Sequence, residues 1–468
     1  MNTEKSLLLI PVENQVRELD PKLLLACIAA RQGFSSVIGS RRQLDFRIAS
    51  FPRGLYLSKS MTVRSIKMFK ILRKLGHEIV AWDEEALVHL PPEIYFSRRL
   101  SARALGYLSH LFAWGRDNAE LWQQYPQLPS ELPIHITGNP RNDMLRPEMH
   151  GFFEDDSEKI RSTYGDFILI NTNFNHINAF YPVQGLFLPE KKPSELPKFG
   201  RAARGMPRKY AEGFRDHKLS VFRDFKDLIP NLEKAFPDYK IVVRPHPTER
   251  HDVYHEISKR CERVHVTNEG NVIPWLMAAK ALIHNGCTTG VEAFVMRVPA
   301  ISYRATVNDY YDFGFYQLPN RMSYQCFNFE GLQETLQKIL AGKLGATNGN
   351  EKQSLIDHFL AARSGPLACE RIVDVLEKIS ADRSRLPKPA LKDRLNGNTR
   401  ATVRRLTKQF MSYLPDSHNR VEFHRHRYPG ISLSEIRERV SRIKNALGDR
   451  VKTEANQISS EIFRIGPK

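Results

Sequence analysis

Short apolar runs recur along the first half of the chain, separated by segments in which apolar residues follow a helical spacing. Strands are expected at residues 7–12, 37–39, 78–82, 94–96, 111–114 and 134–137. Helices are expected at residues 23–30, after an Asp20-Pro21 pair that suits a helix N-terminus, and at residues 66–75. This alternation predicts a parallel sheet with helices on both faces.

The second half repeats the pattern from residue 167 onward. Its expected strands are residues 167–172, 239–243, 281–284 and 298–302. Its expected helices are residues 208–236, 329–341 and 353–379. Residues 180–207 are rich in Pro, Lys and Gly and have no clear period, which predicts a long loop over a ligand cleft. We therefore expect two α/β domains, at residues 1–150 and 160–380, and a separate segment at residues 381–468.

Length and charge support this division. A chain of 468 residues is too long for one ordinary core, and a hydrophobic content of 41% is typical of a globular protein. The formal charge is +18, and residues 381–468 contain 20 Lys and Arg against 9 Asp and Glu. This segment is expected to be a basic helical extension with a final amphipathic helix at residues 432–447. Its expected partner is an anionic membrane surface, with a solvated extension as the alternative; it contains no known nucleic-acid module, so no nucleic acid is expected.

The cysteines and the N-terminus bear on location. The chain has five scattered cysteines, which are Cys27, Cys261, Cys287, Cys326 and Cys369. They form no CxxC pair and do not have the spacing of metal ligands. Such a set is typical of free thiols in a reducing compartment. Residues 7–10 form an apolar run of strand length rather than a signal peptide, and no stretch approaches the ~20 apolar residues of a membrane span. We expect a cytoplasmic protein, peripheral on the inner face of the membrane if the extension binds lipid.

Two motifs follow expected strands of the second half. Arg244-Pro-His-Pro-Thr-Glu-Arg250 follows residues 239–243, and Asn285-Gly-Cys-Thr-Thr-Gly-Val-Glu292 follows residues 281–284. Open α/β sheets bind ligands at the carboxyl ends of their strands. An imidazole, guanidinium groups, hydroxyls and backbone N–H groups suit a diphosphate or a phosphodiester. Each motif alone could be an ordinary turn or helix cap, but the two together indicate an enzyme that uses a sugar nucleotide.

Seven short motifs spread over most of the chain carry a resemblance to a known family. They are Ile10-Pro-Val-Glu-Asn-Gln-Val-Arg-Glu-Leu-Asp20, Trp82-Asp-Glu-Glu85, Ala113-Trp-Gly115, Thr137-Gly-Asn-Pro-Arg141, Ile170-Asn-Thr-Asn173, Arg244-Pro-His-Pro247 and Gly290-Val-Glu292. With them the chain resembles the bacterial surface carbohydrate biosynthesis proteins, which are found in polysaccharide and nonulosonic-acid gene clusters. The His-Pro turn and the later Thr pair also resemble sialyl-, polysialyl- and Kdo transferases and CDP-glycerol glycerophosphotransferases, although Cys287-Thr288 stands where many relatives carry Ser. The resemblance implies a GT-B fold, in which two Rossmann-like domains face a cleft.

In those relatives the His and the hydroxyls hold the nucleotide phosphate on the C-terminal domain. The residues expected to bind the nucleotide or the donor sugar here are Arg244, His246, Thr288, Thr289, Gly290, Glu292, Asn139 and Asn173. His246 and its neighbours are expected to take up the negative charge that develops on the leaving phosphate. Glu292 either accepts ribose hydroxyls or is a first-turn carboxylate favoured by the helix dipole. The two asparagines are alternatively local turn residues.

The catalytic carboxylate is expected in the N-terminal domain. Asp83, Glu84 and Glu85 follow an expected strand. Clustered carboxylates raise one another's pKa, which suits a general base. The alternative is that these three residues only begin a helix, where acidic residues are favoured.

A rival acidic set follows the first strand. It consists of Glu13, Glu18 and Asp20, and Arg17 beside them is placed to hold a carboxylate of the acceptor or the donor. Whether a carboxylate acts as base in an inverting reaction or as nucleophile in a retaining one stays open.

Taken together, these features predict a glycosyltransferase of surface polysaccharide synthesis. The expected donor is a CMP-activated keto-acid sugar such as Kdo or a sialic-acid-like nonulosonate, and the expected acceptor is a glycan or a lipid-linked sugar. No metal and no further cofactor are expected. The alternatives are a CDP-polyol phosphotransferase, a nucleotide-sugar epimerase, and a non-catalytic nucleotide-binding protein that recruits glycan enzymes through its basic tail.

Overall fold

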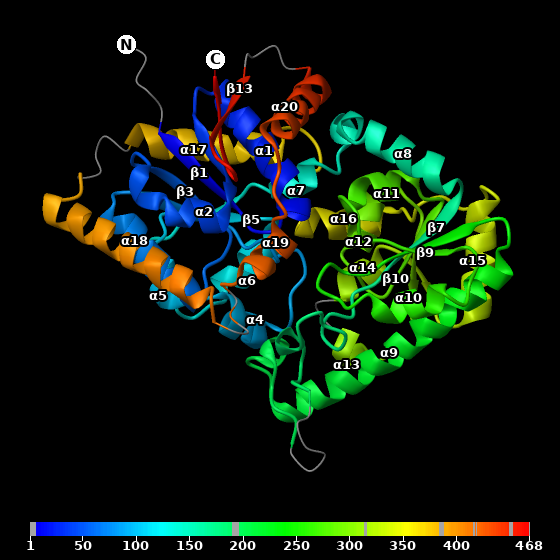
Figure 1. Cartoon of the computed structure of the whole chain (residues 1–468). Coiled ribbons are helices and arrows are strands. Elements are labelled where there is room, and N and C mark those ends of the chain that lie inside the picture. Colours follow the sequence, from blue (N-terminus) through cyan, green and yellow to red (C-terminus); the bar gives the residue numbers. More distant parts are fainter. Residues whose placement is uncertain are drawn as a thin grey trace. The chain divides into compact units, whose positions relative to one another are not determined.

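The chain folds into two compact α/β units (Figure 1). The computed structural model describes residues 6–189, 196–312, 316–382, 388–414, 417, 419–448 and 453–467. Unit 1 comprises Met1–Leu87, Arg99–Phe152 and Leu355–Lys468, and unit 2 comprises Val88–Arg98 and Phe153–Ser354.

Unit 1 is built on an eight-stranded sheet in the order β13-β14-β2-β1-β3-β4-β5-β6. Its strands are β1 (Leu7–Val12), β2 (Ser36–Ser40), β3 (Gly54–Ser58), β4 (Glu78–Ala81), β5 (His110–Ala113), β6 (Ile134–Ile136), β13 (Thr453–Ser459) and β14 (Ile462–Pro467). β1 to β6 run parallel, and the β13–β14 hairpin joins antiparallel to β2. The chain runs from β1 outward to β2 on one side and to β3 on the other, so the topological switch point lies between β1 and β3.

Helices cover this sheet and link its strands. They are α1 (Gln15–Arg31), α2 (Arg41–Phe46), η1 (Ile48–Ser50), η2 (Val63–Ser65), α3 (Ile66–Lys74), α5 (Ala102–Leu105), α6 (Arg116–Gln123), α7 (Pro140–Asp143), η3 (Pro147–Phe152), α17 (Ala368–Asp382), α18 (Leu391–Met411), α19 (Val421–Arg427) and α20 (Leu433–Leu447). α1 begins after Asn14, and Pro21 lies inside it, so the expected start at Asp20 is wrong. The reason is that the Glu18 carboxylate accepts the backbone N–H groups of Glu13 and Asn14, which stabilises an earlier start.

Unit 2 is built on a six-stranded parallel sheet in the order β12-β11-β10-β7-β8-β9. Its strands are β7 (Phe167–Asn171), β8 (Lys240–Arg244), β9 (Val264–Val266), β10 (Ala281–His284), β11 (Ala300–Tyr303) and β12 (Tyr324–Cys326). Its helices are α8 (Glu154–Tyr164), η4 (Pro182–Gln184), η5 (Arg201–Ala203), α9 (Arg208–Ala235), α10 (Asp252–Ser258), α11 (Val272–Ala278), α12 (Thr289–Val295), α13 (Asp309–Asp312), α14 (Gln317–Arg321) and α15 (Phe329–Leu340). The chain passes from one unit to the other within α4 (Pro92–Arg99) and within α16 (Asn350–Phe359). The chain leaves β7 for β8 on one side and returns to β10 on the other, so the switch point lies between β7 and β10.

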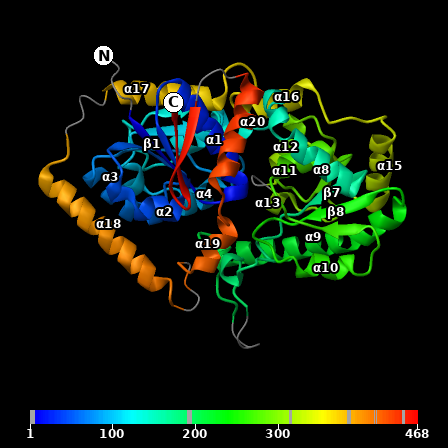
Figure 2. The same ribbon diagram turned by 45° about the horizontal axis from the view of Figure 1, so that its top comes forward.

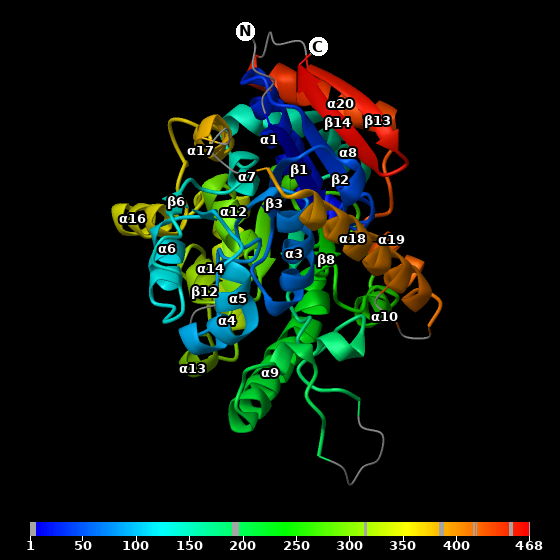
Figure 3. The same cartoon turned by 90° about the vertical axis from the view of Figure 1, so that its left-hand side faces the viewer.

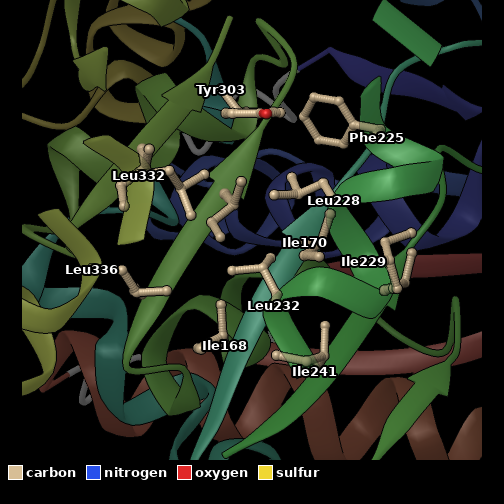
Figure 4. Packing of buried hydrophobic residues seen from close by; sticks show 14 of the residues in the cluster. Ile168, Ile170, Phe225, Leu228, Ile229, Leu232, Ile241, Tyr303, Leu332 and Leu336 are labelled. Carbon is tan, nitrogen blue, oxygen red and sulfur yellow. The ribbon is translucent and has the colours of Figure 1, made fainter. Parts of the chain in front are cut away.

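The core of unit 2 shows why these elements pack as they do (Figure 4). Apolar residues of α9 recur at spacings of three and four and form one stripe toward the sheet. These buried residues are Phe225, Leu228, Ile229 and Leu232, and they meet Ile168, Ile170 and Ile241 from the strands and Leu332 and Leu336 from α15. The stripe fixes α9 across the sheet.

Two expected elements differ in the structure. Residues 94–96 are helical rather than extended, because Pro91-Pro92 begins α4 and fixes a helical backbone angle at its first residue. The single helix expected at 353–379 is divided into α16 and α17 around Gly365-Pro366. α17 packs on α1 within unit 1, so unit 2 ends at Ser354 rather than near residue 380.

The C-terminal segment is part of unit 1 and is not wholly helical. Figure 3 shows the β13–β14 hairpin, in red, lying against β2. Ile462, Phe463 and Ile465 of β14 are fully buried, so this hairpin completes the hydrophobic core. Arg404 of α18 pairs with Asp45 at 3.0 Å. No helix within the described ranges has the length and apolar composition needed to cross a membrane.

Candidate functional site

His246 lies in the loop after β8, next to the carboxyl end of β7. Its Nδ1 accepts a hydrogen bond from the backbone N–H of Thr248 at 3.2 Å and lies 2.8 Å from the Thr248 hydroxyl. An accepting Nδ1 assigns the proton of the neutral ring to Nε2. The side chain is half-buried. The loop therefore presents His246 as an Nε2–H donor, a group that can bind a phosphate oxygen.

Glu249, which sequence reasoning did not single out, fixes this loop. Its buried Oε1 accepts hydrogen bonds from the backbone N–H groups of His246 at 3.2 Å and Phe174 at 2.9 Å, and from the Thr172 hydroxyl at 3.0 Å. The Tyr254 hydroxyl donates to Oε2 at 2.7 Å. Burial raises the pKa of Glu249, and these hydrogen bonds act against the rise. One carboxylate thus joins the loops that follow β7 and β8.

The turn after β10 closes over the buried imidazole of His284. The His284 Nδ1 accepts a hydrogen bond from the backbone N–H of Gly286 at 3.0 Å, and the His284 Nε2 lies 2.8 Å from the Ser323 hydroxyl. Gly286 has a φ of 77°, a backbone angle that favours glycine. A Cβ at Gly290 would come within 2.4 Å of the His284 Nε2. Gly286 is therefore required by its backbone angle and by close packing on Tyr316, and Gly290 by close packing on His284.

The Thr pair lies at the start of α12. The Thr288 side chain makes no hydrogen bond to the first turn of the helix, so an ordinary capping role does not account for its hydroxyl. The backbone N–H of Gly290 donates to the Cys287 carbonyl at 2.9 Å, and that of Glu292 donates to the Thr288 carbonyl at 3.1 Å. Because these N–H groups already form hydrogen bonds within the turn, the Thr288 and Thr289 hydroxyls are the groups of this turn that are suited to bind a ligand. The role of the buried Glu292 carboxylate stays a prediction.

The two motifs come together beside β7. In the sheet, β7 lies between β8 and β10, so the His246 loop and the Thr288 turn flank its carboxyl end. The Asn285 amide donates to the Asn173 carbonyl at 3.4 Å. The Oδ1 atoms of Asn171 and Asn285 are buried and have no hydrogen-bond partner within the described residues. Such atoms are uncommon in folded proteins and mark a place that a water or a ligand completes.

Lys218 of α9 adds a cation to this strand end. It is buried, and its Nζ lies 4.2 Å from the centre of the Tyr316 ring and 5.1 Å from that of Phe174. No carboxylate forms an ion pair with it in the part of the chain that the structure describes. Burial lowers the pKa of Lys218 to about 8, and the acidic groups of Asp312 and Glu249 oppose this shift. A buried ammonium group without an ion-pair partner is costly unless an anion binds beside it.

His176 shares this surrounding. Its Nδ1 lies 3.4 Å from the Tyr316 hydroxyl. Burial first, and then the charges of Arg98 and Lys218, lower the pKa of His176 to about 3. His176 is therefore neutral at pH 7, and the local excess of positive charge is suited to an anion.

Arg244 serves the protein rather than a ligand in this structure. Its guanidinium donates to the carbonyls of Glu269 at 2.7 Å and Gly270 at 3.1 Å, and it lies 4.6 Å from the centre of the Trp275 ring. Burial lowers its pKa to about 9. These contacts hold the loop after β9 in place and do not favour the expected phosphate contact.

In unit 1, the switch point between β1 and β3 holds a network of charges. Glu13, which follows β1, pairs with Arg41 at 2.9 Å, with Lys59 at 3.3 Å and with Arg427 of α19. The charge of Lys59, with those of Arg41 and Arg427, holds the pKa of Glu13 well below its usual range despite burial. Glu13 is therefore ionised and surrounded by cations.

Glu18 and Asp20 have structural partners. Glu18 is buried and pairs with Lys22 at 2.7 Å and with Lys59. Burial acts to raise its pKa, but these two lysines lower it. Asp20 is buried and pairs with Arg439 of α20. Both carboxylates hold elements of unit 1 together, which does not favour the expected contact with an acceptor.

Asp83 and Glu84, which follow β4, are buried. Asp83 is held by Arg99, whose Nε donates at 2.9 Å. Glu84 accepts the indole N–H of Trp82 at 2.8 Å and lies 3.7 Å from the Lys22 ammonium. Neither carboxylate has the exposure that a base acting on a substrate needs.

Glu85 is the exposed member of this set. It pairs with Arg17 at 3.2 Å, so the two residues singled out from separate motifs meet. Partial burial opposes the shift, but the charges of Arg17, Arg99 and Arg141 lower the pKa of Glu85 to about 2. The expectation that clustered carboxylates raise one another's pKa is therefore wrong for Glu85, because the charges of three arginines lower its pKa.

Asn139 has a local role. Its Oδ1 accepts the backbone N–H of Arg141 at 3.0 Å and caps α7. This is the turn function that was the alternative for this residue, and a contact with the donor stays a prediction.

Lys218 and Glu249 are the residues that sequence reasoning missed at this site. A signal existed for Lys218, because it lies four residues after Phe214 and three before Val221, both buried on the stripe of α9. A lysine on an apolar helical stripe is a departure that can be read from sequence. Glu249 lies within the first motif, but nothing in the pattern says that its carboxylate turns inward.

Comparison with known proteins concerns the fold. No family model matches the chain, and no curated protein matches its sequence. The wall teichoic acid polymerase TagF matches with a TM-score of 0.50 and 13% identity, over 81% of this chain and 90% of that chain. A variant of TagF matches with a TM-score of 0.50 and 12% identity, over 82% and 91%. UDP-GlcNAc 2-epimerase from Methanocaldococcus jannaschii, in complex with UDP-GlcNAc and UDP, has a TM-score of 0.45 at 12% identity, over 80% and 99%. With its two parallel-sheet units and its likeness to TagF, the chain has the two-domain GT-B fold.

Proposed function

We propose that this chain is a GT-B transferase that builds a surface glycan from a cytidine-nucleotide donor bound in unit 2. The observation that carries the proposal is that the two sequence motifs flank the carboxyl end of β7, beside the switch point between β7 and β10. A neutral imidazole, two threonine hydroxyls and the buried ammonium group of Lys218 are suited to a nucleotide phosphate. The likeness to TagF supports the fold on which this site is built.

The proposed donor is a CMP-activated keto-acid sugar such as Kdo or a sialic-acid-like nonulosonate. The oxygen of an acceptor hydroxyl attacks the anomeric carbon, the bond from that carbon to the phosphate oxygen breaks, and CMP leaves with the electron pair. His246, Thr288 and Thr289 stabilise the charge that develops on CMP. The acceptor proton passes to a carboxylate base.

The rest of the proposal follows from this reaction. The proposed acceptor is a glycan or a lipid-linked sugar. The proposed reaction requires the donor and the acceptor, and it uses no metal and no further cofactor. Arg17 and the cations around Glu13 make unit 1 suited to an anionic acceptor. We place the reaction in the cytoplasm, where nucleotide-activated sugars are made.

A CDP-polyol phosphotransferase is the second candidate, and one observation favours it. A TagF structure with this fold was obtained after a soak with CDPG. In that reaction the acceptor oxygen attacks the phosphorus that carries the polyol, the bond between the two phosphates breaks, and CMP again leaves. The same residues of unit 2 would stabilise CMP, so the two candidates differ in the group transferred.

The first experiment measures thermal stability with CMP, CDP, UDP, GDP and ADP. A ligand that binds only the folded chain stabilises it by about 2.7 kcal/mol at a concentration of 100 Kd. We expect CMP and CDP to raise the Tm of the wild type and to have little effect on His246→Ala. His255→Ala, a change at an exposed histidine of α10, is the matched control and should respond as the wild type does.

The outcomes separate the candidates. A preference for UDP or GDP contradicts a cytidine donor, and no response to any nucleotide contradicts a nucleotide site in unit 2. If CMP binds, incubation with CMP-Kdo or with CDP-glycerol and a glycan acceptor follows. The mass added to the acceptor is that of a sugar in one case and that of a phosphopolyol in the other. Donor turnover without acceptor would indicate the epimerase instead.

A further inference from the structure

α18 packs on unit 1 through its small and polar residues. Figure 2 shows this helix, in orange, running beside α3 and α2. Gly397 and Ala401 are the buried residues of α18, and a Cβ at Gly397 would come within 2.9 Å of the Leu75 side chain. Asp393 pairs with Lys74 at 2.8 Å, and Arg404 pairs with Asp45. The face of α18 that is turned toward the protein is therefore held by close backbone approach and ion pairs.

The opposite face of α18 is apolar and exposed. Its exposed side chains follow one another at spacings of four, eight, three and four residues, which places them on one side of a helix. They are Leu391 (73% exposed), Leu395 (57%), Val403 (57%), Leu406 (55%) and Phe410 (69%). A surface helix of a globular protein normally turns such a stripe toward the core. α18 turns it outward, which marks a surface that something else covers.

Charge indicates what covers it. α18 contains six basic residues and one acidic residue, and the basic residues are Lys392, Arg394, Arg400, Arg404, Arg405 and Lys408. A second copy of the chain on this stripe would bring two such helices together and place like charges against each other. A surface that carries negative charge over an apolar layer can bury the apolar stripe and pair with the basic residues of α18.

A basic cavity beside the helix supports the same ligand. It has a volume of about 520 Å³ and lies between α3 and the first half of α18. Arg53, Lys70 and Arg73 are among the residues that line it. Arg73 pairs with Glu78 at 2.7 Å, whereas Arg53 and Lys70 have no acidic partner in the described ranges. These cations lie on the side of α18 that faces α3, and they add to the positive charge that attracts an anionic surface to this part of unit 1.

We propose that the outer face of α18 docks on an anionic lipid bilayer, with the helix lying in the plane of the interface and its apolar stripe among the acyl chains. Leu395, Leu406 and Phe410 enter the bilayer, and the basic residues along the helix contact the headgroups. The proposal is independent of the reaction catalysed.

The test uses the full chain and sedimentation with lipid vesicles. We expect the wild type to bind vesicles of phosphatidylglycerol and phosphatidylcholine, to bind pure phosphatidylcholine weakly, and to lose binding as salt rises. The combined variant Leu395→Ser, Leu406→Ser and Phe410→Ser should bind anionic vesicles at least about tenfold more weakly, because each replacement removes apolar area that the bilayer buries. Its Tm should equal that of the wild type, because these side chains are exposed.

The matched control replaces exposed apolar residues of unit 2. Leu196→Ser with Tyr310→Ser changes side chains of 74% and 67% exposure and should leave vesicle binding unchanged. Wild-type protein that stays in solution with anionic vesicles, or a combined variant that binds as the wild type does, overturns the proposal. So does a wild-type dimer that the combined variant converts to monomer, because the stripe would then be an interface between copies. Equal binding to both vesicle types would overturn the requirement for negative charge.

Discussion

Glu249 fixes the geometry of the loops that carry the proposed nucleotide site. Its one Oε1 atom accepts the hydrogen bonds of His246, Phe174 and Thr172. Glu249→Ala leaves these buried donors unpaired, and we expect it to lower the free energy of unfolding of unit 2 by about 3 kcal/mol or more. Glu249→Gln keeps one acceptor oxygen and should cost less than half as much. Urea denaturation followed by circular dichroism measures both, and equal losses in the two variants would contradict this account.

Lys218 gives the site a dependence on pH. Burial lowers its pKa to about 8 from an ordinary value of 10.5, so its ammonium group loses its proton as the pH rises through about 8. The phosphate of CMP is almost fully ionised above pH 7, because its last pKa is about 6. The affinity for CMP should therefore be highest near pH 7 and fall by about tenfold by pH 9.5.

Calorimetric titration with CMP across this range checks the prediction. In Lys218→Met the affinity should be weak and independent of pH, because the variant keeps the length of the side chain without its charge. A wild-type affinity that is constant to pH 9.5 would show that Lys218 does not contact the nucleotide.

At the residue scale, local patterns predicted the groups that share a motif. His246 and the Thr pair were identified because each follows a recognisable strand and has the chemistry of a phosphate ligand. Lys218 lies 28 residues before His246, and only the packing of α9 on the sheet places it beside Phe174. The roles expected for Arg244 and Glu18 were not favoured by the structure, because each found partners within its own unit.

At the element scale, the start of α12 depends on a glycine. A Cβ at Gly290 would lie 2.4 Å from the His284 ring, which is fully buried and has no space to move. Gly290→Ala should therefore destabilise unit 2 by about 2 kcal/mol and weaken nucleotide binding, because the Thr288 turn shifts with the helix. Gly345→Ala is the matched control, since nothing lies within 4 Å of a Cβ there and its φ is not in the left-handed region. Melting temperatures of the two variants provide the measurement; an unchanged Gly290→Ala would show that the turn is loosely packed.

Elements with strong periodicity were predicted well, and weak or short ones were not. The strands β1, β8 and β10 and the helices α9 and α15 lie within one or two residues of their expected positions. β3, β9 and β12 were missed, and so was the β13–β14 hairpin. The strand expected at 94–96 is part of α4, because three apolar residues in a row do not distinguish the two structures.

At the scale of the whole molecule, the last residues of the chain complete the first unit. Phe463 of β14 is fully buried, whereas Ile458 of the same hairpin is 41% exposed. Phe463→Ala should lower the free energy of unfolding of unit 1 by about 3 kcal/mol or more, and Ile458→Ala should change it by less than about 0.5 kcal/mol. The unit 1 transition in urea denaturation distinguishes the two. Equal effects would mean that the hairpin contributes little to the core.

The alternation of strands and helices was sufficient to predict two α/β units, the family resemblance added the GT-B fold, and the two motifs indicated the strand ends of the proposed nucleotide site. These properties depend on local spacing and on the rule that parallel strands place their carboxyl ends at one edge. Tertiary structure alone decided which charges pair. The low pKa of Glu85, the isolation of Lys218 and the outward stripe of α18 depend on segments distant in sequence. Burial and ion pairing act through space, whereas a sequence pattern records only neighbours along the chain.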